Sequence, residues 1–403
     1  MKNLQRSFSA SLLAVPALLL SLYLSCVSTA AARIERVVVP PAPVDTTPQQ
    51  SAQTSGTQSS GAQTSSITPG VQGIISDING RLFDLRAGGG EEGGLGSSID
   101  DGVIDGQGDG QGDGPKNPIA TKVLRSRQWE VFTTVNYSNI KLNSIGTQAG
   151  AKSYSWAPGV GVERHVSPNI TVGFSASLLE THQTYTGGLG ILDLQGVVLS
   201  TYTSYVRKAL WIDLLYSFGR FDIDTQRNPG FNFPVALGNT NAYTNAAQLN
   251  TGWNFRFQNN TLITGPFVGL DYLHVQVDGY AENGGGLAAL AYGVRDTDSL
   301  ISRIGWATSK QITTDFAVIT PQIRLSYERQ NINRNNGTSV NLINQPFTAT
   351  ATSQSPGQSY MVVGAGVNFQ FTPDFNMQLT YQGQYLRENM QAHYAGVRFG
   401  YKF

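Results

Sequence analysis

Apolar and polar residues alternate with a period of two from Arg127 to the end of the chain. The clearest runs lie between Asn245 and Gln258, between Tyr360 and Phe371, and between Phe375 and Gln384. A period of two with one apolar face is typical of antiparallel strands that are buried on one side. The pattern therefore predicts an all-β domain over residues 125–403.

Twelve such runs are present, and most exceed the roughly 5–6 residues of a globular strand. They are long enough for the about 9–11 residues that a tilted strand needs to cross a bilayer. The runs begin near Arg127, Ser153, Asn169, Ile191, Ala209, Thr244, Thr261, Ser299, Phe316, Gln358, Phe375 and Gln391.

Short and long connections alternate between these runs. Tight turns such as Ser167-Pro168-Asn169 and Thr372-Pro373-Asp374 contrast with long polar segments over 225–243, 281–298 and 334–357. Short turns at one rim and long loops at the other are typical of outer-membrane barrels. The sequence thus predicts a 12-stranded antiparallel transmembrane β-barrel, whose even strand number places both barrel ends at the short-turn, periplasmic rim.

A soluble β-sandwich is the alternative for the same alternation. Aromatic residues near the strand ends favour the barrel instead, because a membrane barrel carries an aromatic girdle at each interface. These aromatic residues are Trp129, Tyr137, Trp211, Tyr216, Trp253, Tyr272, Trp306, Tyr381, Tyr385, Phe399 and Tyr401.

Residues 1–32 have the order of a secretory signal peptide. Lys2 and Arg6 precede an apolar run over 8–24, and small residues follow over 28–32. A peptide with this order directs export and is then removed by cleavage. Lipidation at Cys26 is the alternative. Either way, the mature chain leaves the cytoplasm, and no later segment has the about 18 consecutive apolar residues of a membrane-spanning helix.

Three segments precede the predicted barrel. Residues 33–70 hold no Leu and no aromatic residue, which predicts a disordered low-complexity segment. Residues 71–90 predict an amphipathic helix, because apolar side chains recur at three-and-four spacing. Residues 91–124 read as a Gly/Asp-rich linker, since the spacing of a calcium-binding loop is absent.

The barrel lumen is the concave surface that could cover the apolar face of this helix. We therefore expect a luminal helix, with a helix free in the periplasm as the alternative. The residues expected inside the lumen are Ile74, Ile78, Arg81, Leu82, Leu85 and Arg86, with Arg81 and Arg86 paired to acidic groups such as Glu130 or Glu328. From the strand register, the pore-lining candidates are Glu130, Arg256, Arg303, Arg324, Glu328 and Arg398.

The composition limits which partners and which catalytic or metal sites this chain can have. The chain of 403 residues has 27 basic and 27 acidic side chains, a single cysteine and four histidines. Zero net charge argues against a nucleic-acid partner, and one cysteine excludes a disulfide scaffold. Catalytic-motif and metal-ligand spacings are absent, so we expect no enzyme, no catalytic residue, no metal and no cofactor. A hydrolase assembled from separate strands remains the alternative.

The last strand alternates up to a terminal aromatic residue. Phe399, Tyr401 and Phe403 share one face of this run. An edge strand that ends the chain in this way is a natural pairing substrate. We expect these three residues to form the assembly signal that outer-membrane barrel assembly machinery recognises.

Several segments together resemble the autotransporter β-domain family, the translocator of type V secretion. The segments are Gly265-Pro266-Phe267-Val268-Gly269-Leu270-Asp271-Tyr272, Gly279-Tyr280-Ala281-Glu282-Asn283-Gly284, Ser299-Leu300-Ile301-Ser302-Arg303-Ile304-Gly305, Phe399-Gly400-Tyr401-Lys402-Phe403 and, before the barrel, Gly80-Arg81-Leu82-Phe83-Asp84-Leu85-Arg86.

The resemblance implies a 12-stranded barrel in the outer membrane of a Gram-negative bacterium. It also implies a helix-filled lumen that leads to an exported passenger, with membrane lipid as the surroundings and a monomer as the assembly. This chain departs from the family because only residues 33–124 lie between signal and barrel. The expected function is a translocator that anchors and exports a short N-terminal segment. An outer-membrane channel or surface-structural barrel with an N-terminal plug and no cargo is the alternative.

Overall fold

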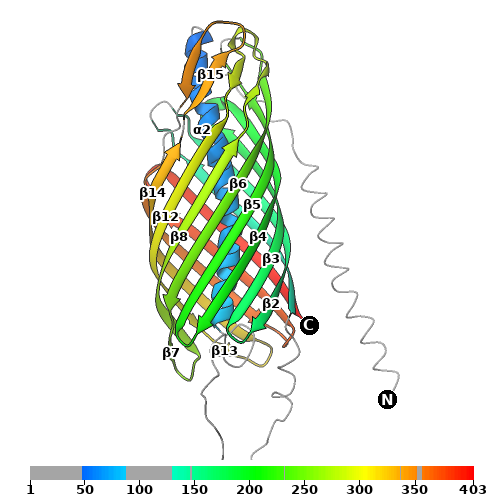
Figure 1. Cartoon of the computed structure of the whole chain (residues 1–403), viewed down its shortest axis with the longest axis vertical. Coiled ribbons are helices and arrows are strands. Elements are labelled where there is room, and N and C mark those ends of the chain that lie inside the picture. The colour runs from blue at the N-terminus through cyan, green and yellow to red at the C-terminus, as the bar shows by residue number, and fades with distance from the viewer. Residues whose placement is uncertain (1–47, 88–128, 146–147, 231, 336, 352–355) are drawn as a thin grey trace, which may run out of the picture. The chain divides into compact units, whose positions relative to one another are not determined.

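Twelve antiparallel strands close into a barrel around one long helix, which confirms the predicted fold (Figure 1). This computed structural model describes residues 48–87, 129–145, 148–230, 232–335, 337–351 and 356–403. The predicted signal peptide over 1–32 and the predicted linker over 91–124 lie outside the described residues.

The barrel wall follows the chain order around its circumference. Its strands are β1 (Trp129–Leu142), β2 (Ala151–Ser167), β3 (Ile170–Tyr185), β4 (Gly190–Arg207), β5 (Leu210–Arg227), β6 (Ala236–Trp253), β8 (Leu262–Val277), β12 (Arg295–Lys310), β14 (Val318–Asn335), β17 (Ser359–Gln370), β18 (Phe375–Tyr385) and β19 (Met390–Lys402). Each strand pairs with its neighbours, and β1 also pairs with β19, where Glu130 lies opposite Lys402. This last ladder closes the wall.

Side chains alternate between the outer surface and the lumen along every wall strand. In β1 the polar residues Glu130, Thr134 and Asn136 are buried inside the barrel, whereas Val131 and Val135 are exposed outside. The outward face carries large apolar side chains such as Trp156 and Ile304, which are 50% and 60% exposed. An apolar exterior over a polar interior is the arrangement that a bilayer requires.

The predicted aromatic girdle needs one correction. Most of its members face outward, but Trp211 is only 4% exposed and belongs to a buried cluster with Phe83 of the helix. Trp211 has the same strand parity as the buried Asp213, and both side chains therefore face the lumen.

The two rims of the barrel differ, as the loop lengths predicted. The short-turn rim carries the tight connections and the short strands β7 (Phe255–Phe257) and β13 (Ile312–Thr313). The long loops carry β9 (Tyr280–Ala281), β10 (Asn283–Gly284), η2 (Gly286–Ala288), β11 (Leu290–Tyr292), β15 (Thr338–Leu342) and β16 (Thr348–Ala351), and η1 (Thr186–Gly188) joins β3 to β4. Strands β16, β15, β11 and β9 form a separate four-stranded sheet, and with η2 they make up what we call the collar.

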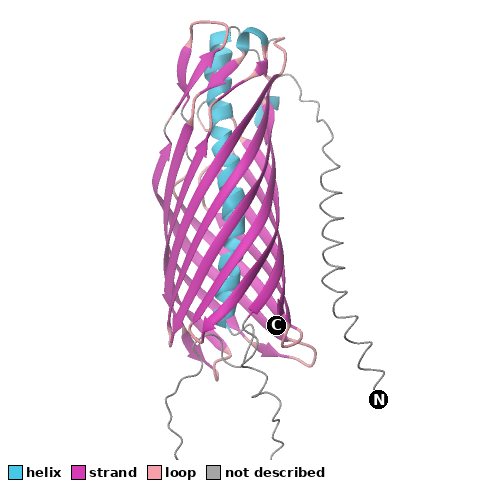
Figure 2. Cartoon of the chain, turned by 45° about the vertical axis from the view of Figure 1, so that its right-hand side comes forward, coloured by secondary structure: helices cyan, strands magenta, loops and turns pink. Residues whose placement is uncertain are grey.

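The helix α2 (Pro48–Ala87) is 40 residues long and lies inside the wall in both views (Figures 1 and 2). It begins at Pro48 and not at Val71, so residues 48–70 are helical where the sequence predicted disorder. Nucleation is the costly step of helix formation, and residues from Ile67 onward are held by the barrel. Extending a helix that is already held adds one backbone hydrogen bond per residue and needs no second nucleation step. Among the described residues, no helix is apolar enough over a sufficient length to cross a bilayer.

Candidate functional site

The apolar stripe of α2 packs against one half of the lumen wall. Ile67, Val71, Ile74, Ile78, Leu82 and Leu85 are all buried in a single cluster with apolar side chains of β3, β4, β5, β6 and β8. Leu179, Leu194 and Phe221 are examples from the wall, each 1% exposed or less. The lumen is therefore two-sided, with an apolar half beneath the helix stripe and a polar half on β1, β14, β17, β18 and β19.

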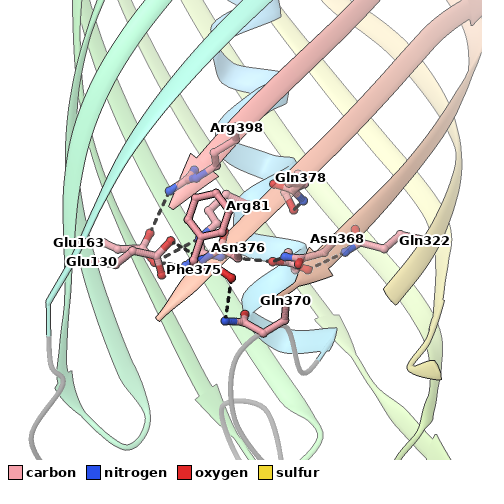
Figure 3. Close-up of polar contacts among 12 residues, drawn as sticks. Arg81, Glu130, Glu163, Gln322, Asn368, Gln370, Phe375, Asn376, Gln378 and Arg398 are labelled. Atoms are coloured by element: carbon pink, nitrogen blue, oxygen red, sulfur yellow. Dashed lines mark hydrogen bonds and ion pairs between the residues drawn. The ribbon is translucent and has the colours of Figure 1, made fainter. Parts of the chain in front are cut away.

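Arg81 is the centre of the charged contacts between helix and wall (Figure 3). Its guanidinium donates to Glu130 of β1 and to Glu163 of β2, and Nη1 donates to Asp84 one helical turn away at 3.2 Å. All four side chains are at most 1% exposed. Burying such a group is costly unless its charges are paired, and here three carboxylates surround it.

Wall residues hold these carboxylates in place. Tyr202 Oη donates to Glu163 at 2.9 Å, and Asn376 Nδ2 donates to Glu130 at 3.2 Å. Arg398 reaches Glu163 at 3.4 Å while its guanidinium lies 3.5 Å from the ring centre of Phe132. The acceptor site for Arg81 is thus built by the wall itself.

Asp84 ties the helix to the opposite side of the barrel. Its carboxylate accepts hydrogen bonds from Gln322 of β14 at 2.9 Å and from Asn368 of β17. Nearby, Gln378 of β18 donates to the Gly80 carbonyl at 3.1 Å. The same helical turn is therefore held from β1, β2, β14, β17 and β18 at once.

Arg86 fixes the end of the helix at the short-turn rim. Nη1 donates to Asp213 of β5, and the guanidinium lies 3.9 Å from the ring centre of Trp211. Ser204 Oγ donates to the other Asp213 oxygen at 2.7 Å. The predicted pairing of Arg81 with Glu130 is present, whereas the partner of Arg86 is Asp213.

Weaker polar contacts continue along the helix towards the long-loop rim. Thr134 Oγ1 donates to Asp77 at 2.9 Å, and Ser76 Oγ donates to Gln382 at 2.8 Å. Two cavities beside α2 measure about 40 and 50 Å³. Each has room for only a few water molecules, since one water needs about 10–15 Å³ by this measure.

The six pore-lining candidates do not form one site. Glu130 and Arg398 belong to the Arg81 cluster. Arg303 lies elsewhere in the lumen, paired with Asp271 and with Glu328 at 3.5 Å, and Arg324 donates to Gln382 at 3.1 Å. Arg256 lies half-buried on the short strand β7 at the short-turn rim.

The expected luminal helix residues all lie inside the wall. Ile74, Ile78, Arg81, Leu82, Leu85 and Arg86 are each at most 7% exposed. The sequence prediction missed Glu163, Asp213 and Tyr202 as wall partners. Each of them occupies an inward position of its strand, and that parity is the signal that could have found them.

The four histidines are spread over separate strands. Three of them bond to outward-facing neighbours, namely His182 to Asp193 at 2.6 Å, His274 to Asp298 at 2.9 Å and His393 to Tyr381 at 2.8 Å. Within the described ranges, no group of three or more His, Cys, Asp or Glu residues could hold a metal ion.

The C-terminal strand completes the wall at the short-turn rim. Phe403 N donates to the Trp129 carbonyl at 3.0 Å, and Phe399 stacks on Phe375 with ring centres 6.4 Å apart. Tyr401 and Phe403 are exposed on the outside.

Truncating Phe403 together with Phe399→Asp and Tyr401→Asp is expected to lower the membrane-inserted fraction while export from the cytoplasm continues. Charge on a lipid-facing position costs about 2–4 kcal/mol for Arg or Lys at the midplane and less for Asp. The measurement is the heat-modifiable band on unboiled gels. Leu386→Asp, in the β18–β19 loop and 86% exposed, is the control. Equal insertion of the triple variant and this control would contradict the assignment.

Comparison with known proteins identifies the family to which this barrel is related. The chain matches the family model described as "Autotransporter beta-domain" over residues 131–382. A search of curated proteins finds no match. The fold is similar to the translocator domain of the autotransporter NalP from Neisseria meningitidis, with a TM-score of 0.57 and 17% identity over 68% of this chain and 88% of that one. It is also similar to the β-domain of the Bordetella autotransporter BrkA, with a TM-score of 0.54 and 13% identity over 68% of this chain and all of that one.

The family match covers more than half of the 403 residues, and it agrees with the closed barrel, the apolar exterior and the helix-filled lumen described above. The chain belongs to the autotransporter β-domain family, and its barrel is an outer-membrane translocator domain of the Gram-negative autotransporter type.

Proposed function

We propose that this translocator exports the N-terminal segment of its own chain and then keeps it anchored through α2. The exported part is the short stretch that precedes the helix, and the anchor is the set of buried contacts between helix and wall. Barrel assembly machinery inserts the chain through the C-terminal strand, and the finished protein works as a monomer in outer-membrane lipid.

The direction of α2 is the observation that carries this proposal. Its C-terminal end is held by Asp213 next to the short β4–β5 turn, whereas its N-terminal part contacts β15 and β16 in the long loops. Short turns face the periplasm and long loops face the cell exterior. The N-terminal end of α2, at Pro48, therefore lies on the exterior side.

The charged contacts supply the anchor. Arg81 and Arg86 are five residues apart on the helix and meet separate acceptors on β1, β2 and β5. An apolar stripe alone could slip by one helical turn, whereas a displaced Arg81 would be buried without a partner. Buried polar pairs are known to fix register in helical assemblies in this way.

A channel with a plug and no exported cargo is the second candidate function. The small cavities beside α2 argue against an open pore while the helix is in place, so the two candidates differ in whether the N-terminal segment reaches the cell surface. The decisive experiment places an epitope tag ahead of Pro48 and compares the full chain with a deletion of residues 71–90. We expect the tag of the full chain to be cut by protease added to intact cells, and its single-channel conductance to be low. The deletion variant should keep a heat-modifiable barrel and conduct more.

Two results would contradict the proposal. A tag that is protected in intact cells but cut after the outer membrane is opened would place the segment in the periplasm. A full chain that already conducts as much as the deletion variant would support an open channel with a peripheral tail.

A further inference from the structure

The collar has its own small core at the long-loop rim. Leu290, Tyr292, Val340 and Leu342 are buried together, with Ala351 of β16 beside them. The loop between β8 and β12 supplies two of these strands, and the connection between β14 and β17 supplies the other two. Two separate loops therefore meet across the mouth of the barrel, where β11 pairs with β15.

The upper part of α2 completes the collar. α2 contacts β11, β15, β16 and η2, and both views show its upper end beside the collar strands (Figures 1 and 2). A 40-residue helix is about 60 Å long at 1.5 Å per residue, twice the roughly 30 Å hydrocarbon core of a bilayer. The helix is therefore long enough to fill the membrane part of the lumen and still reach through the collar.

A buried ion pair between Arg227 and Glu282, which we call the clasp, joins the collar to the wall. Arg227, the last residue of β5, donates through Nε and Nη2 to the two oxygens of Glu282 at 2.7 and 2.5 Å. Nη2 also donates to the Ala288 carbonyl at 2.7 Å, and Glu282 accepts the Leu290 amide at 2.9 Å. One carboxylate thus links the wall to β11.

We propose that the collar is a gate that stays open while chain passes through the barrel and closes around α2 when export is complete. This inference rests on the proposed export of the N-terminal segment. Short strands with one apolar face are stable only when another element covers that face. During passage an extended chain occupies the mouth in place of α2, so the collar lacks its cover and its two loops separate.

Cross-linking of β11 to β15 tests the gate. Ala291 and Asn341 lie opposite each other, on the face away from the collar core, so cysteines there leave that core intact. Opposed residues in such a ladder have Cα atoms about 4.5–5.5 Å apart, within reach of a short bismaleimide. The double variant Ala291→Cys/Asn341→Cys carries, ahead of Pro48, a fused domain that folds only with bound calcium. Added calcium folds this domain before export, and the folded domain is too large to pass through the barrel, so export stalls.

The gate predicts efficient cross-linking without calcium and loss of the cross-link when the folded domain stalls export. Gln195→Cys/Asp222→Cys, opposed on neighbouring wall strands, is the matched control and should cross-link in both states. Glu282→Ala, which removes the clasp, should lower the 291–341 cross-link even after complete export.

Equal 291–341 cross-linking in stalled and completed chains would overturn the gate, as would full cross-linking in Glu282→Ala. Protease access to the fused domain is scored separately. A domain that never reaches the surface without calcium would refute the proposed export, whereas normal display with an unchanged cross-link would refute only the gate. Loss of the control cross-link as well would show a misfolded wall. The comparison of Glu282→Ala with its parent in the unfused chain then decides, because a full 291–341 cross-link without the Arg227–Glu282 ion pair overturns the gate.

Discussion

Arg81→Met is expected to destabilise the protein by about 3–5 kcal/mol, because three buried carboxylates lose the counter-charge that they share and only Arg398 remains beside Glu163. Glu130 and Glu163 would lose their shared donor, while the wall around them stays closed to water. The check is the temperature at which the folded band disappears on unboiled gels, together with the conductance of the inserted barrel. Both should shift, since the helix loses its charged contacts to β1 and β2 and is then held by its apolar stripe, Asp84 and Arg86.

The matched control is Arg164→Met, next to Glu163 on β2. Arg164 faces outward over Trp129, 5.0 Å from the ring centre. An exposed cation–π contact is worth only about 0.5–1 kcal/mol. Adding Glu130→Gln and Glu163→Gln to Arg81→Met should recover part of the loss, because the uncompensated charges are gone. A loss in Arg81→Met no larger than in the control would show that α2 is not held by this cluster.

Gly173→Val is expected to abolish most barrel assembly. A Cβ atom at residue 173 would lie 2.0 Å from the ring of Tyr202, which fills the space above this glycine on the neighbouring strand. Overpacking costs about 1–3 kcal/mol and at times more, and here it would also pull Tyr202 away from Glu163. The readout is the fraction of protein that migrates as a heat-modifiable band.

Gly364→Val provides the comparison at another inward-facing glycine. The nearest atoms to a Cβ at residue 364 are 3.7 Å away, in ordinary contact. This variant should assemble nearly as well as the parent. If both variants assemble equally, the close packing of Tyr202 over Gly173 has no role in folding.

Period-two alternation located eleven of the twelve wall strands to within a few residues. The exception is β6, expected near Thr244 and observed from Ala236. Its first outward positions are Leu237, Asn239 and Asn241, and Asn239 donates to Asp224. A strand that continues past the bilayer has no need of an apolar exterior there, so the alternation of apolar and polar residues stops before the strand does.

The lumen was harder to predict than the wall. The sequence predicted acidic partners such as Glu130 or Glu328 for the two helix arginines, because a helix in a polar barrel needs them, and Arg81 does contact Glu130. The apolar half of the lumen could not be found in this way. In β4, Leu192, Leu194 and Val198 face inward while Val197 and Leu199 face outward, so both faces are apolar and alternation carries no contrast.

The ladder between β1 and β19 has a consequence for how copies of this chain could meet. It joins residues 272 positions apart, such as Glu130 and Lys402, and leaves the membrane wall without a free strand edge. Edge-to-edge pairing between two barrels inside the bilayer is therefore ruled out. The edges that remain belong to short strands such as β16, at the end of the collar sheet. Any strand-mediated contact with another chain must then be made outside the membrane, where water competes for every backbone hydrogen bond.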